Sequence, residues 1–260
     1  MTLTLFQVDA FTDHLFGGNP AAVCPLEQWL PDATMQNIAM ENNLAETAFF
    51  IPKEDHFHLR WFTPAVEVDL CGHATLATAY VLFHYLDWKK PELVFESRSG
   101  ILRVKKDNDL LTLDFPADSL QLIEPSKELN SCLGIEPLET YLGKTDFMAV
   151  VASQKEVENL QPDFLRMSRL TGRGVIVTAP GETVDFVSRF FAPQVGINED
   201  PVTGSAHTTL TPFWSARLGK TNLKAIQLSA RKGHLNCQLK GDRVEISGKG
   251  QLYMKGDIHI

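Results

Sequence analysis

Cysteine is scarce in this sequence, and its spacing argues against the two structures that cysteine most often builds. Only four cysteines occur in 260 residues, and no two of them form a CxxC pair. This spacing predicts neither a disulfide framework nor a zinc site. We expect reduced thiols and no metal, with the cysteines at Cys24, Cys71, Cys132 and Cys237.

Long apolar runs and clusters of basic residues are also missing. No apolar run reaches the roughly 20 residues that a membrane-spanning helix needs. The N-terminal segment MTLTLFQVDAF has no basic residue and meets Asp9 before a signal peptide's apolar core could form. The formal net charge of -8 argues against a nucleic-acid partner, because phosphate binding needs clustered Lys and Arg. These features predict a cytoplasmic protein without a membrane or nucleic-acid partner.

Several cofactor and catalytic motifs do not occur. The sequence has no P-loop, no GxGxxG fingerprint and no Gly-x-Ser-x-Gly elbow. No motif therefore predicts a nucleotide cofactor or a hydrolase serine. A composition with 44% hydrophobic residues is enough to build the packed cores of one large domain or two ordinary ones. We expect a globular protein whose partner is a small molecule.

The most apolar helix that the sequence predicts begins directly after Gly72. From His73 to Tyr85 there is no Asp, Glu, Lys or Arg, so this helix should run through the middle of its domain. The backbone N–H groups of Gly72, His73 and Ala74 have no intrahelical acceptor. With the helix dipole they favour a carboxylate or phosphate by about 0.3–2 kcal/mol. The helix start therefore predicts a buried anion-binding site.

A second helix start of the same kind follows Asp200, where Gly204 and Ser205 open another apolar helix. A shorter match precedes it, since Arg60-Trp-Phe-Thr-Pro64 recurs as Arg189-Phe-Phe-Ala-Pro193. Matches in one order, spaced by about half the chain, predict an internal duplication. The two glycines are three residues further apart than the two arginines, which predicts an insertion around Asn198-Glu199-Asp200.

The duplication predicts an α+β fold with two similar domains, residues 1–118 and 119–260, joined near Phe115 to Pro125. Each would be a strongly bent, mostly antiparallel sheet around its apolar helix, and the last strand could pair with the first domain. The pseudo-twofold relation would bring both helix starts to one interdomain cleft. In the first half we expect a helix from about 30 to 43 and strands over 3–10, 21–24, 48–51, 57–62, a stretch ending near 71, 93–96, 100–105 and 110–115.

Glu46 lies in an otherwise apolar passage at the start of an expected strand. It could be a surface carboxylate at a strand end. It could also be a general acid/base, because apolar neighbours disfavour the charged form of a carboxylate. The repeat places Gly174 or a neighbour opposite Glu46, so one half of the site has a base that the other lacks.

Four polar residues near the two helix starts are further candidates. His73 could face the cleft and hold or relay a proton, or it could be a packed or capping residue. Asp200 precedes Pro201, which keeps it extended and outside the helix, so its carboxylate could accept from a substrate. Ser205 could contact a ligand or be a simple N-cap, and His207 is a weaker candidate further into the helix.

His56-Phe-His58 places two imidazoles on one face of a strand, which is compatible with a metal pair. No further ligand stands at a recognisable spacing. We interpret the two histidines as solvent-exposed.

Four ordered motifs resemble those of the PhzF-like family of phenazine-biosynthesis-type isomerases, and the resemblance covers the whole chain. They are Asn19-Pro20, Ala45-Glu46-Thr47-Ala48-Phe49, Gly72-His73-Ala74-Thr75 and Asp200-Pro-Val-Thr-Gly-Ser-Ala206. The resemblance implies a diaminopimelate epimerase-like fold of two pseudo-symmetric domains, a homodimer, and no cofactor or metal for the isomerisation. It also implies that Glu46 is the catalytic acid/base that moves a proton between carbons of the substrate ring. His73, Asp200 and Ser205 occupy the other matching site positions.

The epimerase relatives use two thiols, one at each helix start. Here Cys71 precedes Gly72, but Thr203 precedes Gly204, and a threonine cannot supply a thiolate. We therefore expect a cofactor-independent isomerase that shifts a proton within a small carboxylate-bearing substrate, bound at Gly72, Gly204 and Ser205. The alternatives are a racemase or epimerase of an amino or hydroxy acid that uses Cys71, and a non-catalytic small-molecule binding protein.

Overall fold

The computed structural model describes residues 1–124 and 126–260. The chain divides into two compact units. The first unit comprises Met1–Phe115 and Ile246–Ile260, and the second comprises Pro116–Glu245. The boundary predicted between residues 118 and 119 lies close to Phe115, and Pro125, the end of the predicted linker, lies outside the described residues.

The first unit is an α+β unit whose strands pair mostly in antiparallel fashion. β2 and β3 are parallel, as are β4 and β6, while the other pairs are antiparallel. Its helices are α1 (Asp32–Asn42) and α2 (Gly72–Tyr85). Its strands are β1 (Thr2–Ala10), β2 (Asn19–Pro25), β3 (Glu46–Pro52), β4 (Phe57–Phe62), β5 (Glu67–Val68), β6 (Glu92–Ser97), β7 (Gly100–Asp107), β8 (Leu110–Pro116) and β17 (Gly250–His259).

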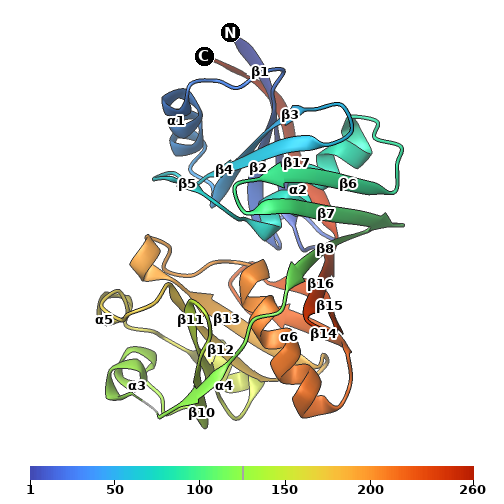
Figure 1. Ribbon diagram of the computed structural model, residues 1–260. Coiled ribbons are helices and arrows are strands. Elements are labelled where there is room, and N and C mark those ends of the chain that lie inside the picture. Colours follow the sequence, from blue (N-terminus) through green and yellow to red (C-terminus); the bar gives the residue numbers. More distant parts are fainter. Residues whose placement is uncertain (125) are drawn as a thin grey trace. The chain divides into compact units, whose positions relative to one another are not determined.

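Helix α2 is the buried centre of the first unit. It packs against β1, β2, β3 and β17, and Figure 1 shows it among these strands. Its threonines do not leave buried hydroxyls unpaired, because Thr75 and Thr78 donate to the carbonyls of Cys71 and Ala74, one turn earlier. The predicted strand ending near Cys71 is shorter than expected, since β5 stops at Val68 and a loop leads to the helix.

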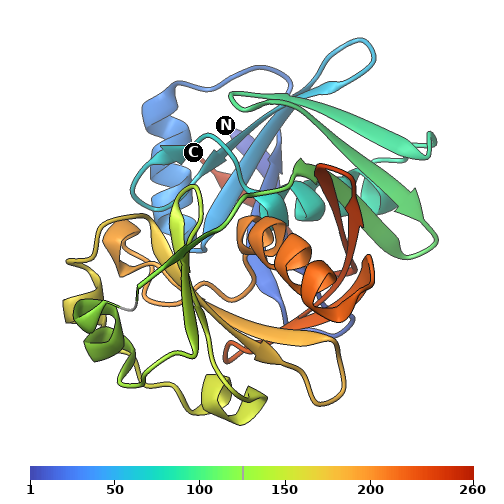
Figure 2. The ribbon, with the colours of Figure 1, turned by 60° about the horizontal axis from the view of Figure 1, so that its bottom comes forward.

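The N- and C-terminal strands of the chain lie side by side in the first unit. β17 pairs antiparallel with β1 from Thr2 opposite His259 to Ala10 opposite Gly250. Both views show the two ends together (Figures 1 and 2). The C-terminal strand thus completes the first unit although most of the preceding 130 residues belong to the second.

The second unit repeats the strand order of the first. β11 and β12 are parallel, β12 and β13 antiparallel, β13 and β14 parallel, and β14 and β15 antiparallel. This is the order of β2, β3, β4, β6 and β7. The elements are β9 (Gln121–Ile123), α3 (Lys127–Leu133), β10 (Glu139–Leu142), β11 (Asp146–Val150), α4 (Gln154–Asn159), α5 (Phe164–Met167), β12 (Gly174–Pro180), β13 (Phe186–Phe191), the 3-10 helix η1 (Pro193–Val195), α6 (Gly204–Leu218), β14 (Asn222–Gln227), β15 (Gly233–Lys240) and β16 (Arg243–Gly248), which crosses into the first unit.

Helix α6 contains a proline whose structural cost is offset locally. Pro212 has no N–H to donate to the carbonyl of Thr208, one turn earlier. The backbone N–H of Asp118 donates to that carbonyl instead, at 3.1 Å. The Asp118 carboxylate also accepts from the Thr209 hydroxyl at 2.9 Å. The helix is therefore tied to the segment between β8 and β9.

A matched arginine–glutamate clamp closes the loop before the central helix of each unit. The guanidinium of Arg60 donates twice to Glu67, at 2.7 Å each, and that of Arg189 donates twice to Glu199, at 2.7 and 2.9 Å. The clamps span seven and ten residues, respectively. The three extra residues therefore lie between Arg189 and Glu199, on the N-terminal side of the predicted position around Asn198-Glu199-Asp200.

Within residues 1–124 and 126–260, no helix has both the length and the apolarity to cross a membrane.

Candidate active site

Glu46 and His73 meet inside the first unit. Glu46 is the first residue of β3 and pairs in parallel register with Ala21 of β2, while His73 is the second residue of α2. Their side chains are only 12% and 5% exposed, and Glu46 Oε2 lies 3.0 Å from His73 Nε2. These two buried atoms make no well-aligned hydrogen bond to any described residue, including each other. The contact is thus an ion pair without an aligned hydrogen bond.

The other side of the imidazole faces two more polar groups. Nδ1 of His73 lies 3.2 Å from the amide nitrogen of Asn19, the first residue of β2, and 3.5 Å from Sγ of Cys71. Because β2 and β3 are parallel neighbours, Asn19 and Glu46 both stand at the same end of the sheet as the start of α2. His73 therefore bridges a carboxylate and a thiol through opposite ring nitrogens.

The neighbours of His73 determine its charge. Burial by itself lowers the pKa of His73, but Cys71 and Glu46 outweigh it and raise the pKa well above 6.5. Burial, assisted by the charge of Glu46, raises the pKa of Cys71 to about 11. The thiol is thus neutral at pH 7, which leaves the Glu46 carboxylate as the charged neighbour of His73 at that pH.

Glu46, Cys71 and His73 also offer ligand atoms within 4.8 Å of one another, close enough to consider a metal ion. A zinc ion lies about 2.0–2.3 Å from each of its ligands. At the shortest distances, however, Glu46 approaches Nε2 of His73 and Cys71 approaches Nδ1, so the two groups lie closest to different nitrogens of the ring.

The second unit carries a different set of groups at its helix start. The hydroxyl of Thr203 donates to Asp200 at 2.5 Å. The amide of Gln227 in β14 accepts from the Thr203 N–H at 2.9 Å and donates to the Asp200 carbonyl at 2.7 Å. Gln227 is fully buried and fixes the loop that carries Asp200.

Ser205 is not the N-cap of α6, although the sequence allowed that role. The N-cap is Thr203, and Ser205 stands two residues further on. Its hydroxyl accepts from the guanidinium of Arg173 at 2.9 Å. His207, a weaker candidate from the sequence, is a core residue: its Nδ1 donates to the Thr203 carbonyl at 2.8 Å, and burial lowers its pKa to about 4.

Gly174 explains why the second unit has no counterpart to Glu46. It begins β12 as Glu46 begins β3. A Cβ at this position would lie 2.6 Å from the ring of Phe190 and 2.8 Å from the carbonyl of Phe191. Only glycine fits, so the repeat cannot place a carboxylate here.

Neither helix start is capped by a side chain. No oxygen from the N-cap residue bonds back into α2 or α6, and no acidic residue stands in the first turn of either helix. Anion binding by the backbone N–H groups at Gly72 and Gly204 therefore stays a prediction with which these uncapped helix starts are compatible.

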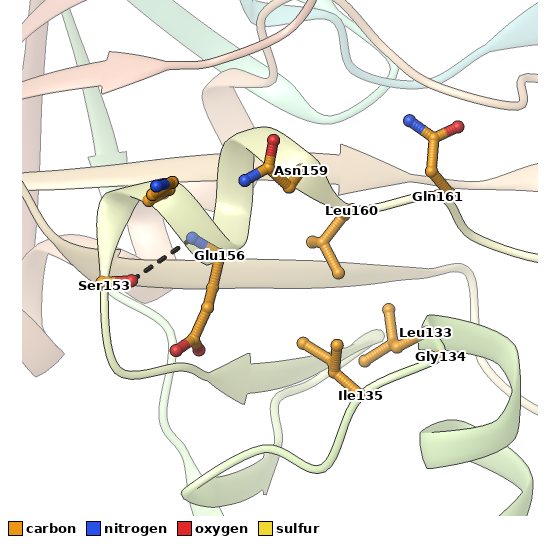
Figure 3. Close-up of a pocket in the computed structure, with 9 residues that line it drawn as sticks. Leu133, Gly134, Ile135, Ser153, Glu156, Asn159, Leu160 and Gln161 are labelled. Atoms are coloured by element: carbon orange, nitrogen blue, oxygen red, sulfur yellow. Dashed lines mark hydrogen bonds between the residues drawn. The ribbon is translucent and has the colours of Figure 1, made fainter.

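A pocket of about 470 Å³ lies elsewhere in the second unit, between the end of α3 and helix α4. Figure 3 shows that Leu133, Ile135 and Leu160 line one part of it. Glu156, on its polar side, is engaged in capping α4, because its backbone N–H donates to Ser153 and its carboxylate accepts from the Ala152 N–H. None of the candidate residues lines this pocket.

The two histidines of the His56-Phe-His58 motif have separate partners. His56 contacts Asp55 and Glu96 at 2.8 and 3.3 Å, whereas the ring of His58 packs edge-on against Trp29. They do not form a metal pair among the described residues.

Sequence reasoning missed Arg173, Asp146 and Gln227. Arg173 lies in the stretch Thr-Gly-Arg-Gly, which is typical of a turn. Its position next to Gly174, the residue that the repeat aligns with Glu46, was the available signal. No comparable pattern marks Gln227, whose partners lie 24 and 27 residues away.

The comparison with known proteins shows the family to which the chain belongs. The family model for phenazine biosynthesis-like proteins, PhzC-PhzF, matches residues 8–256. The chain belongs to this family. Two uncharacterized isomerases of Pseudomonas aeruginosa are 55% and 50% identical to it over the full length of both chains.

Solved structures agree with this assignment. A PhzF family protein of Enterococcus faecalis has a TM-score of 0.98 at 49% identity, and all of both chains is covered. A hydroxyproline epimerase of Agrobacterium vitis has a TM-score of 0.62 at 13% identity, covering 99% of this chain and 91% of its own. The second likeness concerns the fold alone and confirms the predicted epimerase-like architecture.

Proposed function

We propose that this PhzC-PhzF family member is a cofactor-independent isomerase that shifts a proton within a small carboxylate-bearing substrate. The observation that carries the proposal is the buried pair of Glu46 Oε2 and His73 Nε2, 3.0 Å apart and without an aligned hydrogen bond to any described residue. Catalytic hydrogen bonds are often poorly aligned until the substrate is present. The isomerase relatives support the reaction class.

In this mechanism Glu46 is the single proton carrier. The carboxylate takes a proton from a substrate carbon, and the C–H electron pair spreads into the conjugated system as an enolate of the substrate's carboxylate. Glu46 then returns the proton to another carbon of that system. The protonated His73 keeps the negative charge at Glu46 compensated, and the free N–H groups at Gly72 stabilise the charge that develops on the carboxylate.

Gly204 and Ser205 would bind the substrate's carboxylate together with the first helix start, and Asp200 would bind another polar group of the substrate. The internal repeat supports a shared site, because it places the second helix start in the same structural context as the first. A crystal grown from sulfate tests this part. An anion held by the N–H groups of Gly72 and His73 and also by those of Gly204 and Ser205 is expected, whereas an anion at one start alone would contradict the shared site.

The decisive experiment measures deuterium uptake from D₂O into a panel of small cyclic carboxylates. Glu46→Gln should slow uptake by about a hundredfold or more, since positioned general bases contribute 10²–10⁴. Glu96→Gln is the matched control, because Glu96 contacts His56 in a similar carboxylate–imidazole pair at the surface. Equal uptake in Glu46→Gln and wild type would exclude Glu46 as the base.

Two other functions give different results in the same assay. A racemase that uses Cys71 is favoured by the 3.5 Å contact between its Sγ and His73, and it would lose most of its activity in Cys71→Ser. A binding protein would bind a carboxylate tightly without any deuterium entering it. Localisation in the cytoplasm and a homodimer complete the proposal, and light scattering at micromolar concentration tests the dimer.

A further inference from the structure

The hydroxyl of Ser205 is held by a guanidinium that has its own rigid support. Arg173 donates to Ser205 Oγ at 2.9 Å. The same guanidinium donates to Asp146 twice, through Nε at 2.9 Å and through Nη2. Asp146 is the first residue of β11, and its side chain is 5% exposed.

Arg173 makes two further contacts, one through its backbone N–H and one through the planar face of its guanidinium. Its N–H donates to the Thr145 carbonyl at 2.8 Å. Its guanidinium lies over the ring of Phe190, 5.2 Å from the centroid. Because both the fork to Asp146 and the ring contact need a planar group, a lysine could not reproduce this geometry.

The direction of the Ser205 hydroxyl follows from these contacts. Arg173 has donors only, so Ser205 Oγ must accept from it. The hydroxyl proton of this half-buried serine therefore points away from the guanidinium, where it can be donated to an acceptor atom of a ligand.

We propose that Arg173 is a positioning residue that acts through Ser205, by fixing its hydroxyl so that it donates to the substrate's carboxylate. This inference rests on the proposed function, because it assumes that Ser205 contacts the substrate. Arg173 adjoins Gly174, the counterpart of Glu46, just as Ser205 is the counterpart of His73. The two repeats thus pair a carboxylate with an imidazole in one copy and a guanidinium with a hydroxyl in the other.

The test is a double-mutant cycle with benzoate as the probe, using the full chain. Binding is followed by the NMR shifts of the Gly204 and Ser205 amides. We expect Ser205→Ala to weaken benzoate binding about tenfold, which is the effect of losing one good hydrogen bond. Arg173→Lys, which keeps the charge, should weaken it severalfold in the wild type but by less than about twofold in Ser205→Ala.

Arg217→Ala is the matched control. The side chain of Arg217 is 37% exposed, and that of Arg173 is 36% exposed. Like Arg173, Arg217 contacts a carboxylate, that of Glu139, and lies over a phenylalanine ring, that of Phe213. It differs in its position, because it lies at the C-terminal end of α6. It should leave benzoate binding unchanged. Thermal melting of every variant separates a loss of stability from a loss of binding.

The outcomes separate the inference from the proposed function. If the effects of Arg173→Lys and Ser205→Ala multiply in the double variant, Arg173 does not act through Ser205, and the inference is wrong while the anion site stands. If benzoate does not shift the Gly204 and Ser205 amides of the wild type, the proposed substrate site and the inference both fail.

Discussion

Nε2 of His73 lies 3.0 Å from Oε2 of Glu46, while Nδ1 of the same ring lies 3.5 Å from Sγ of Cys71. One imidazole therefore links the proposed base to the one thiol at a helix start. The charge on that imidazole determines which neighbour can exchange a proton, and it can be measured directly.

His73 should remain protonated at neutral pH. Its pKa is raised well above 6.5, with Glu46 as the charged partner. A folded-state pKa above the unfolded value means that this interaction stabilises the fold fully below about pH 6.5 and is lost as pH rises through the folded value. ¹⁵N NMR of the ring should show both nitrogens protonated at pH 7. Glu46→Gln should bring deprotonation to a lower pH, and an unchanged titration in that variant would contradict the pairing.

Cys71 should react slowly and contribute little to isomerisation. With a pKa of about 11, very little thiolate is present at pH 7.5. Because all four cysteines are buried, Ellman's reagent should rapidly label fewer than about one thiol per native chain. After the chain is unfolded in guanidinium, the reagent should label all four thiols. Cys71→Ser should keep deuterium uptake within about threefold of wild type. Rapid labelling of Cys71, located by mass spectrometry, would instead favour the racemase.

His207 should make the fold sensitive to acid. Its pKa is lowered from 6.5 to about 4 by burial, so the unfolded chain binds a proton that the folded chain does not. The folded state therefore loses stability as pH falls from 6.5 to 4, by about 3 kcal/mol at 1.36 kcal/mol per unit. His207→Asn, which keeps a donor for the Thr203 carbonyl, should flatten this dependence in urea titrations at pH 7 and pH 4.5. The exposed control His234→Asn should retain it.

Gln227 should stabilise the loop before α6. Gln227→Ala removes the acceptor of the buried Thr203 N–H, and an unsatisfied buried group costs about 1–3 kcal/mol. The free energy of unfolding in urea should fall by that amount. Gln121→Ala, at an exposed position of β9, should change it by less than about 0.5 kcal/mol. An equal decrease in the free energy of unfolding in both variants would show that the Gln227 hydrogen bonds do not specifically stabilise the fold.

The elements that the sequence predicted well are those whose cause is local or repeated. The stretch from His73 to Tyr85 contains no Asp, Glu, Lys or Arg, and it forms α2, most of whose residues are buried. The repeated Arg-x-Phe and Gly motifs reflect the same strand order in both units. Glu46 was found because apolar neighbours make a carboxylate conspicuous.

The remaining features depend on contacts between distant parts of the chain. Helices α4 and α5 have six and four residues, too short for a periodic pattern. The proposed role of Arg173 depends on its contacts with Asp146 and Ser205, which lie 27 and 32 residues away in the sequence. The position of the insertion also required the structure, because the Glu67 and Glu199 clamps, and not the sequence spacing, show which loop residues correspond.

The close packing of Gly174 against Phe190 limits how this scaffold could be redesigned. A symmetric enzyme with a carboxylate in each copy would need Gly174→Glu, but the new Cβ would meet the Phe190 ring at 2.6 Å and the Phe191 carbonyl at 2.8 Å. Trimming the ring alone would remove the surface on which Arg173 lies, and the backbone carbonyl would still obstruct the new side chain. The substitution Gly174→Glu therefore requires a shift of strand β13 before the second copy can hold a carboxylate at this position.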